Sequence, residues 1–274
     1  MACIIAGIGI SHSPGAIFAH DNGHATRREW RGFFEPLDAV RAWLREAAPD
    51  MIVMVFNDHL NSFFFDAYPT LAMGVAPQYP LAPEAGAYPP FPPIPGHAAA
   101  PALAEALVNA DFDLTICQDL PLDHGAAGPL RLLGEPWLAP VVPIAVNTLR
   151  APMPRPARLF QLGRALRHAI AALPDALRVV VVGTGGLSHA LDGPGAGIIN
   201  TAWDLEFLRL IAQAPTMLAA RSVQDFAAGA GREGLESMMW LAMRGALPKD
   251  VRAMICAHHP MGVTGLGLTL LLPE

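Results

Sequence analysis

The chain has 274 residues, of which 53% are hydrophobic and 15% charged, and its formal net charge is −6 at pH 7. This length and apolar content allow one large core, so we expect a single domain over residues 1–274. The negative charge argues against a nucleic-acid partner, and no run reaches the ~18 apolar residues that a membrane helix needs. Met1–Ile10 lacks the features of a signal peptide, so we expect a cytoplasmic protein. The three cysteines lie far apart, which allows neither a disulfide framework nor a Cys-x-x-Cys metal site.

A strand followed by a histidine opens the chain. The apolar run Cys3–Ile10 predicts a buried strand, and the motif SHSPG, residues 11–15, follows it at once. Its proline cannot continue a strand ladder and its glycine permits a turn, so we expect His12 just past the strand end. A polar loop comes next, in which we expect His20 and His24 to face solvent.

A second unit of the same kind lies at Met51–Phe56, an apolar run typical of a strand buried on both faces. Asn57, Asp58 and His59 follow it directly. Ligands collect outside the carboxyl ends of parallel strands, so His12 and His59 together suggest a metal site at one edge of a sheet. A loop histidine capped by Asp58 is the simpler alternative for His59.

The middle of the chain contains a long proline-rich stretch. Thr70–Gly96 carries eight prolines, and a segment of this length without regular structure is typical of a binding loop, a lid or an interface. Farther on, Asp123-His124-Gly125 is expected to close a turn soon after a strand. The other elements predicted up to this point are the helices Phe34–Ala48, His97–Val108 and Pro156–Ala172 and the strands Leu114–Gln118 and Val141–Val146.

The strand predicted at Arg178–Val182 runs into the glycine-rich segment GTGGLSH, residues 183–189. Glycines at such a turn let the backbone approach a ligand closely. The segment is not a dinucleotide fingerprint, because no helix opens directly behind it, and the Gly-x-Ser-x-Gly of a nucleophile elbow is absent. A Ser–His hydrolase is therefore the weaker alternative. The remaining predicted elements are the helices Thr201–Ala212, Ser222–Ala228, Gly234–Arg244 and Pro248–Ala257 and a last strand Leu266–Leu272.

Four histidines follow predicted strand ends, which suggests one shared site: His12, His59, His124 and His189. A metal held by two histidines needs a further donor, and Glu236 lies in an apolar helix where an unpaired carboxylate is costly to bury. Glu233, nearer the helix start, is explained by the helix dipole. Two neutral histidines and one carboxylate, with the opposite face open, form the ligand set of non-haem Fe(II) oxygenases.

Motifs spread over nearly the whole chain resemble one family. They are SHSPG, NDHLNSFF, LDHGAAGPL, VVGTGGLSHAL, GAGIINTAWDLEF and EGLESMMWLAMRGALP, and their order also matches. The sequence resembles the class III extradiol ring-cleavage dioxygenases, and within them looks most like the catalytic (β) subunits of protocatechuate 4,5-dioxygenases. The resemblance implies an α/β fold, a single-domain αβα sandwich with a mixed central sheet, and an enzyme that opens a substituted catechol ring with O2.

The same resemblance implies the roles of particular residues. It assigns Fe(II) to His12, His59 and Glu236, the catalytic base to His189, and the second active-site histidine to His124. Contacts to the substrate are expected from Ser188, Thr264 and His258. The implied assembly is a homodimer or a complex with a small α subunit, and Thr70–Gly96 is the candidate for part of the lid or interface.

One departure from the family pattern concerns the substrate. Where the protocatechuate enzymes have a Ser-Asn pair that contacts the substrate carboxylate, this chain has Gly262 and Val263. We therefore expect weaker selection for a ring carboxylate. Two alternatives to the dioxygenase remain: a non-catalytic metal-binding or scaffold relative of the same fold, and a Zn(II)-dependent hydrolase that uses the same ligands, because the ligand set alone does not choose the metal.

Overall fold

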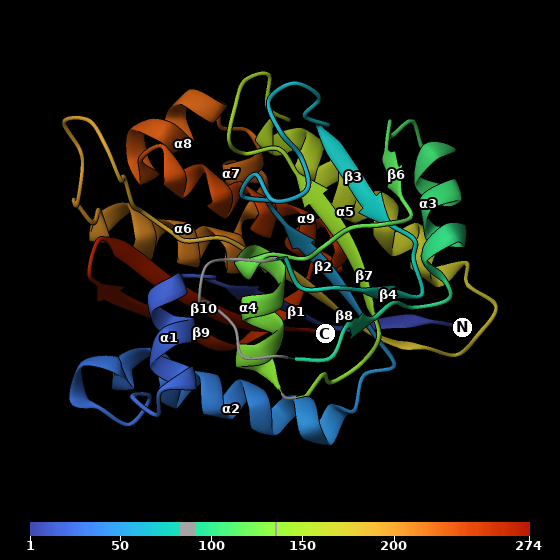
Figure 1. The fold of residues 1–274 in the computed structure, drawn as a ribbon, viewed down its shortest axis with the longest axis horizontal. Coiled ribbons are helices and arrows are strands. Elements are labelled where there is room, and N and C mark those ends of the chain that lie inside the picture. The colour runs from blue at the N-terminus through green and yellow to red at the C-terminus, as the bar shows by residue number, and fades with distance from the viewer. Residues whose placement is uncertain (83–90, 135) are drawn as a thin grey trace.

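An eight-stranded mixed sheet runs through the centre of the molecule in the computed structural model (Figure 1), which describes residues 1–82, 91–134 and 136–274. In order across the sheet, the strands are β6 (Thr115–Cys117), β3 (Leu71–Gly74), β7 (Val141–Val146), β2 (Met51–Phe56), β8 (Arg178–Thr184), β1 (Cys3–Ile10), β10 (Thr264–Pro273) and β9 (Val251–Met261). The short strands β4 (Gln78–Tyr79) and β5 (Ile94–Pro95) form a separate pair.

Four neighbouring strands in the middle of the sheet, β7, β2, β8 and β1, run parallel. All six residues of β2 are buried, as expected for a strand covered on both faces. The sheet is mixed because β10 pairs antiparallel with β1, and β3 pairs antiparallel with β7. The carboxyl ends of β1, β2 and β8 therefore meet at one edge of the sheet, as predicted from the histidine positions.

Helices cover both faces of the sheet, which confirms the predicted αβα sandwich. One face is covered by α1 (Pro14–Asp21), α2 (Arg31–Ala47) and α4 (His124–Leu133). The other is covered by α3 (Ala100–Val108), α5 (Pro156–Ala171), α6 (Thr201–Gln213), α7 (Pro215–Ala219), α8 (Val223–Ala230) and α9 (Trp240–Ala246). Successive β2 side chains pack alternately into the two hydrophobic cores on either face of the sheet, Val53 into one and Met54 into the other. Within the described residues, no helix combines the length and the apolar character needed to span a bilayer.

The predicted helix Pro248–Ala257 is wrong, because its residues 251–257 belong to β9, which pairs antiparallel with β10 along its length. As the last strand of the sheet, β9 has only one strand partner, and most of its residues are partly or fully exposed. An edge strand of this kind lacks the apolar run that marks a central strand. Its conformation is imposed by pairing with a strand that follows it in the chain, which overrides local propensity.

The structure also differs from the predictions in several short segments. Residues expected in a loop after His12 form α1, and Asp123 begins α4 instead of closing a turn. The stretch Thr70–Gly96 contains β3, β4 and β5, while its residues 83–90 lie outside the described part of the chain. His20 and His24 are half-buried rather than solvent-facing. The expected helix from Gly234 begins as the 3-10 helix η2 (Glu233–Met239) and continues as α9, and a short 3-10 turn η1 (Arg28–Trp30) precedes α2.

Helices α5 and α9 approach each other through glycines. A Cβ added to Gly163 would lie 2.0 Å from the carbonyl oxygen of Ala242, and one added to Gly245 would lie 2.2 Å from that of Phe160. Both contacts are with backbone atoms, which cannot rotate away. The absence of side chains at these two positions therefore sets the distance between the helices.

We expect Gly163→Ala to lower the free energy of unfolding by about 1–3 kcal/mol, the usual cost of overpacking. Helix propensity alone predicts that this substitution raises the free energy of unfolding, because alanine is favoured over glycine by about 1 kcal/mol in a helix. The matched control is Gly15→Ala in α1, where the added Cβ meets nothing closer than 3.5 Å. Urea unfolding of the two variants measures the difference, and a Gly163→Ala protein as stable as the control contradicts the packing argument.

Candidate metal centre

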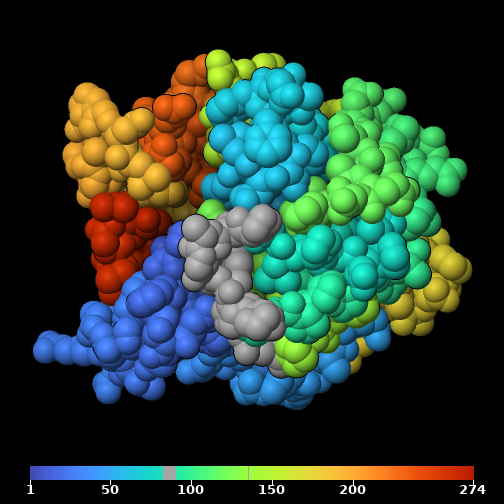
Figure 2. Space-filling model, in the orientation of Figure 1, coloured from blue at the N-terminus to red at the C-terminus, as the bar shows by residue number. Residues whose placement is uncertain are grey.

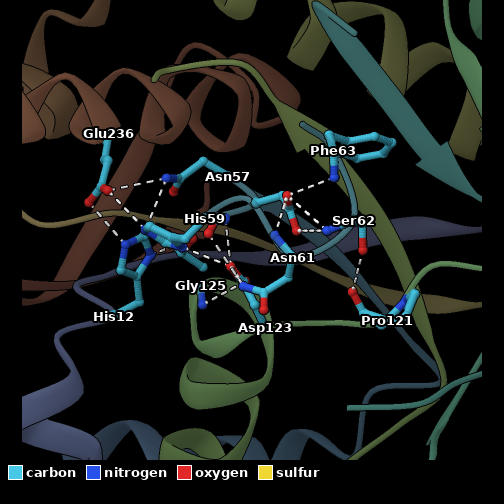
Figure 3. Close-up of polar contacts among 12 residues, drawn as sticks. His12, Asn57, His59, Asn61, Ser62, Phe63, Pro121, Asp123, Gly125 and Glu236 are labelled. Atoms are coloured by element: carbon cyan, nitrogen blue, oxygen red, sulfur yellow. Dashed lines mark hydrogen bonds and ion pairs between the residues drawn. The ribbon is translucent and has the colours of Figure 1, made fainter. Parts of the chain in front are cut away.

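The parallel strands deliver polar side chains to one edge of the sheet. His12 follows β1, Asn57 and His59 follow β2, and Gly185 follows β8. Because these strands are neighbours in the order β2-β8-β1, the residues after them meet across the strand ends (Figure 3). This convergence of the two histidines agrees with the prediction from the sequence.

The carboxylate of Glu236 lies where the two histidines converge. Its Oε2 is 2.9 Å from His12 Nε2, and its Oε1 is 3.2 Å from His59 Nε2. Gly186 N–H donates to Oε2 at 3.3 Å. Glu236 is buried, so two imidazoles and one carboxylate meet inside the protein.

Glu236 is held in this place by a close backbone contact. A Cβ added to Gly185 would lie 2.6 Å from the carbonyl carbon of Glu236, and Gly185 has φ +124, which side-chain-bearing residues rarely adopt. The glycines after β8 therefore let η2 pack directly against the strand end. This is a structural reason for the glycine-rich segment that the sequence analysis identified.

The orientation of His59 is set by Asp123. The Asp123 carboxylate accepts a hydrogen bond from His59 Nδ1 at 2.8 Å and another from the His59 backbone N–H at 2.7 Å. It also caps α4 by accepting from Gly125 N–H at 2.9 Å. A carboxylate on Nδ1 fixes the tautomer and turns Nε2 toward Glu236, the arrangement common behind metal-ligating histidines.

The simpler interpretation of the sequence, in which Asp58 caps His59, is wrong. The Asp58 carboxylate instead accepts from the backbone N–H groups of Asn61, Ser62 and Phe63 at 3.0–3.1 Å, which shapes the loop after β2 (Figure 3). Burial raises the pKa of Asp58 despite these hydrogen bonds.

The charges of the cluster are strongly coupled. Burial disfavours the ionised form of Glu236, but His12 and His59 outweigh it and hold the pKa of this carboxyl well below its usual range. Burial likewise opposes charge on His59, yet Asp123 and Glu236 raise the pKa of this imidazole to about 10. Burial lowers the pKa of His12. The site thus holds an ionised carboxylate that already favours a cation beside it.

His124 also reaches the cluster. One ring nitrogen from each of His12, His59 and His124 can be chosen so that all three lie within 4.8 Å of one another, close enough to hold a metal ion. The His124 ring stacks on that of His59, with centroids 4.0 Å apart and planes inclined by 25°, whereas the His12 and His59 rings are perpendicular.

Asn57 is a site residue that the sequence analysis did not assign. Its Nδ2 donates to Glu236 Oε1 at 3.1 Å and lies 3.1 Å from His59 Nε2. Its Oδ1 is buried and has no hydrogen-bond partner within the described part of the chain. Its place directly after a buried strand, two residues before His59, was the signal that could have identified it.

His189 lies beside the cluster, with Nε2 3.8 Å from Glu236 Oε2. Its Nδ1 lies 3.1 Å from the carbonyl oxygen of Leu187. A carbonyl can only accept, so Nδ1 carries the proton in this hydrogen bond, and in the neutral imidazole the lone pair is then on Nε2. Thr264 lies next to His189, with which it forms a backbone bridge. Its methyl group would lie 3.1 Å from a Cβ added to Gly186.

Two of the predicted substrate contacts point elsewhere. The Ser188 hydroxyl donates to Asp204 Oδ2 at 2.8 Å, and His258 Nε2 lies 2.9 Å from the same oxygen. Asp204, on α6, is fully buried and was not singled out from the sequence. The structure therefore gathers His12, His59, Glu236, His124 and His189 at one edge of the sheet, with Thr264 next to His189. Ser188 Oγ and His258 Nε2 instead contact Asp204.

Comparison with known proteins identifies relatives of the chain. The family described as "Catalytic LigB subunit of aromatic ring-opening dioxygenase" matches residues 6–269. A gallate dioxygenase of Pseudomonas putida is 36% identical over 195 residues, which cover 70% of this chain and 57% of that protein. A 2,3-dihydroxyphenylpropionate/2,3-dihydroxicinnamic acid 1,2-dioxygenase of Burkholderia vietnamiensis is 32% identical over 225 residues, 73% of this chain and 68% of that protein.

A similar enzyme of Paraburkholderia xenovorans is 34% identical over 71% of this chain and 62% of its own length. The chain thus spans somewhat more than half the length of most of these relatives. An uncharacterized protein of Escherichia coli K12 has the same fold, with a TM-score of 0.57 and 14% identity over 98% of this chain and 100% of that one. The match to the ring-opening enzymes covers the strand ends and η2, which carry the cluster. The chain belongs to the LigB family of extradiol aromatic ring-opening dioxygenases.

Proposed function

We propose that this chain uses Fe(II) and O2 to open the ring of a substituted catechol outside its two hydroxyl groups. The observation that carries the proposal is the convergence of His12 Nε2 and His59 Nε2 on the buried carboxylate of Glu236, at 2.9 and 3.2 Å. A non-catalytic relative would not need this complete donor set together with a histidine base beside it. Family membership supports the same reaction class.

The proposed iron ligands are His12, His59 and Glu236, rather than three histidines. The rings of His59 and His124 are stacked, so the lone pairs in their ring planes run side by side instead of converging on one ion. The perpendicular His12 and His59 rings can converge, and both already face the Glu236 carboxylate. Two histidines and one carboxylate leave positions open for substrate, as in non-haem Fe(II) oxygenases.

The donor set fits a divalent metal on chemical grounds. The ionised Glu236 carboxylate inside the protein is stabilised by a nearby cation. The neighbours of His59 raise its pKa to about 10, so a metal ion at this site would take the place of the His59 proton. When bound, Fe(II) would supply the Lewis-acid and redox chemistry that reaction with O2 requires. The same ligand types accept Zn(II), so a test of the function must compare the two ions.

His189 is the proposed base. Its Nδ1 proton is engaged by the Leu187 carbonyl, which leaves the Nε2 lone pair to take the proton of a catechol hydroxyl. His124, stacked on His59, is the proposed second proton carrier. Imidazole is the side chain that most often serves as general acid and base in enzymes.

The proposed substrate is a gallate-like or otherwise substituted catechol with little dependence on a ring carboxylate. The similarity to a gallate dioxygenase supports the class. At the tip of the β9–β10 hairpin, Gly262 offers no side chain and Val263 is 43% exposed and apolar. Thr264, which forms a backbone bridge with His189, is the residue of this hairpin proposed to contact the substrate. A homodimer or a small α subunit over this face stays a prediction, supported by the exposed side chains of Leu191, Ile198 and Val263 beside the site.

The first prediction concerns the metal. Glu236→Gln should bind Fe(II) far more weakly and lose oxygen uptake with a catechol, because the anionic ligand is gone. The control is Glu233→Gln, since the Glu233 carboxylate accepts from the Leu191 backbone N–H outside the cluster. Anaerobic reconstitution with Fe(II) or Zn(II), followed by metal analysis and oxygen electrode measurements, compares them. Full iron occupancy and turnover in Glu236→Gln would reject this ligand assignment, and activity with Zn(II) would reject the iron chemistry.

The second prediction concerns the base. His189→Phe should retain iron and lose about 10²–10⁴-fold in kcat, the usual contribution of general acid–base catalysis. Iron analysis and steady-state kinetics on the same sample separate the two effects. Loss of iron in this variant would instead make His189 a ligand.

The third prediction concerns the substrate. Values of kcat/KM for protocatechuate, gallate, 3-O-methylgallate and 4-methylcatechol should fall within about two orders of magnitude, since a pocket without polar partners discriminates by only ~10–200-fold. Val263→Asn should raise the preference for protocatechuate over 4-methylcatechol by restoring a polar group. A wild-type preference for protocatechuate by ~10⁴-fold or more, the range of buried polar recognition, would contradict the proposal.

A further inference from the structure

Behind His189 lies a buried carboxylate that the proposed chemistry does not use. Asp204, in the first turn of α6, is 0% exposed, and no Lys or Arg lies within ion-pair distance of it among the described residues. An acidic residue in a first turn is favoured by the helix dipole. Yet α6 is capped by Asn200, whose side chain accepts from Trp203 N–H, and the Asp204 carboxylate bonds entirely to other segments.

Both carboxylate oxygens of Asp204 bind the segment that carries His189. Oδ1 accepts from the Ser188 backbone N–H at 2.7 Å, and Oδ2 accepts from the Ser188 hydroxyl at 2.8 Å. The direction of the second bond is fixed, because Ser188 Oγ is itself the acceptor of the Asn200 backbone N–H at 2.7 Å. Ser188 is thus immobilised at its backbone and at its side chain.

One peptide group joins Asp204 to His189. The Ser188 N–H and the Leu187 carbonyl belong to the same planar unit and point in opposite directions. The N–H side donates to Asp204, and the carbonyl side faces His189 Nδ1 at 3.1 Å. An anion on the N–H polarises the peptide and strengthens its carbonyl as an acceptor. In the neutral imidazole, the chain of bonds therefore holds the His189 proton on Nδ1 and leaves the lone pair on Nε2.

The same carboxylate reaches the hairpin that borders the site. His258 on β9 donates from Nε2 to Asp204 Oδ2 at 2.9 Å. A Cβ on Gly265 of β10 would lie only 2.1 Å from this oxygen. Gly265 also joins the His189 segment directly, since its N–H donates to the Ser188 carbonyl at 2.9 Å and its carbonyl accepts from Leu187 N–H at 3.0 Å. In Figures 1 and 2 the hairpin, in red, and the loop near residue 195, in gold, adjoin on one face.

We propose that Asp204 is a positioning residue, which fixes the tautomer and orientation of His189 through the Leu187–Ser188 peptide and ties this segment to the β9–β10 hairpin. The inference rests on the proposed role of His189 as base. It also gives Ser188 and His258 a role as partners of Asp204, in place of contact with the substrate.

Two variants test the proposal. Asp204→Asn keeps the size of the side chain and removes its charge. Gly265→Ala keeps every hydrogen-bonding group and displaces Oδ2, because the new methyl would lie 2.1 Å from it. The matched control is Thr269→Val, which removes a buried hydroxyl that accepts from Gly9 N–H at 3.1 Å elsewhere on β10. If Asp204→Asn does not fold, Gly265→Ala decides the question by itself.

With iron-loaded protein, we expect both test variants to keep iron and KM while kcat falls about 10–100-fold, the scale found for groups that orient a functional side chain. The control should keep wild-type kcat. Adding Asp204→Asn to His189→Phe should cost nothing further, because a residue that acts through His189 has no effect without it. Losses that multiply in the double variant, or a kcat unchanged in both test variants, overturn the proposal.

A second readout does not need activity. In metal-free protein labelled with ¹⁵N at histidine, the wild type should show His189 protonated at Nδ1, and Asp204→Asn should shift its population toward the Nε2–H tautomer. An unchanged tautomer in both test variants overturns the inference even if the enzyme opens catechols. If the wild type opens no catechol but the tautomer shifts, the proposed function fails and the positioning role of Asp204 stands.

Discussion

The carboxylate of Glu236 keeps a negative charge inside a mostly apolar protein, and a charge in such a place must be balanced locally. The balance comes from His12 and His59, which lie at the ends of neighbouring parallel strands and which hold the pKa of this carboxyl well below its usual range. The approach of η2 to the sheet, across Gly185, brings the charge to them. Without the parallel register of β1, β8 and β2, the two imidazoles would not face one carboxylate.

Two imidazoles of the cluster, those of His59 and His189, are oriented by a group behind the ring. Asp123 acts directly on Nδ1 of His59, and the Leu187 carbonyl does the same for His189. The two cases differ in strength, since a carboxylate is the stronger acceptor. In the proposal above, the Asp204 carboxylate acts on His189 indirectly. It accepts from the N–H of the Leu187–Ser188 peptide, whose carbonyl faces His189. Two buried acids, Asp123 and Asp204, therefore lie behind imidazoles of the site, besides the proposed ligand Glu236.

The proposed substrate side of the site is formed by the β9–β10 hairpin. The β9–β10 hairpin brings Thr264 next to His189, although 75 residues separate them in sequence, and β10 pairs with β1, the last of the four parallel strands. This is also where prediction from the sequence failed, because β9 was expected to be helical. An edge strand has few buried positions, so its sequence carries little of the apolar pattern that reveals a central strand.

The sequence by itself determined the central strands and, through their ends, the placement of His12 and His59, because strands buried on both faces are continuous apolar runs that local pattern reveals. The motifs also indicated the family, and family membership was confirmed. Only the tertiary structure decided what holds those histidines and which polar groups lie behind them. Asp123, Asn57 and Asp204 act on residues that are near in space and, for Asp204 with His258, 54 positions apart in the chain. Local sequence records neither such pairings nor the charge balance they create, since both arise only when distant segments are packed together.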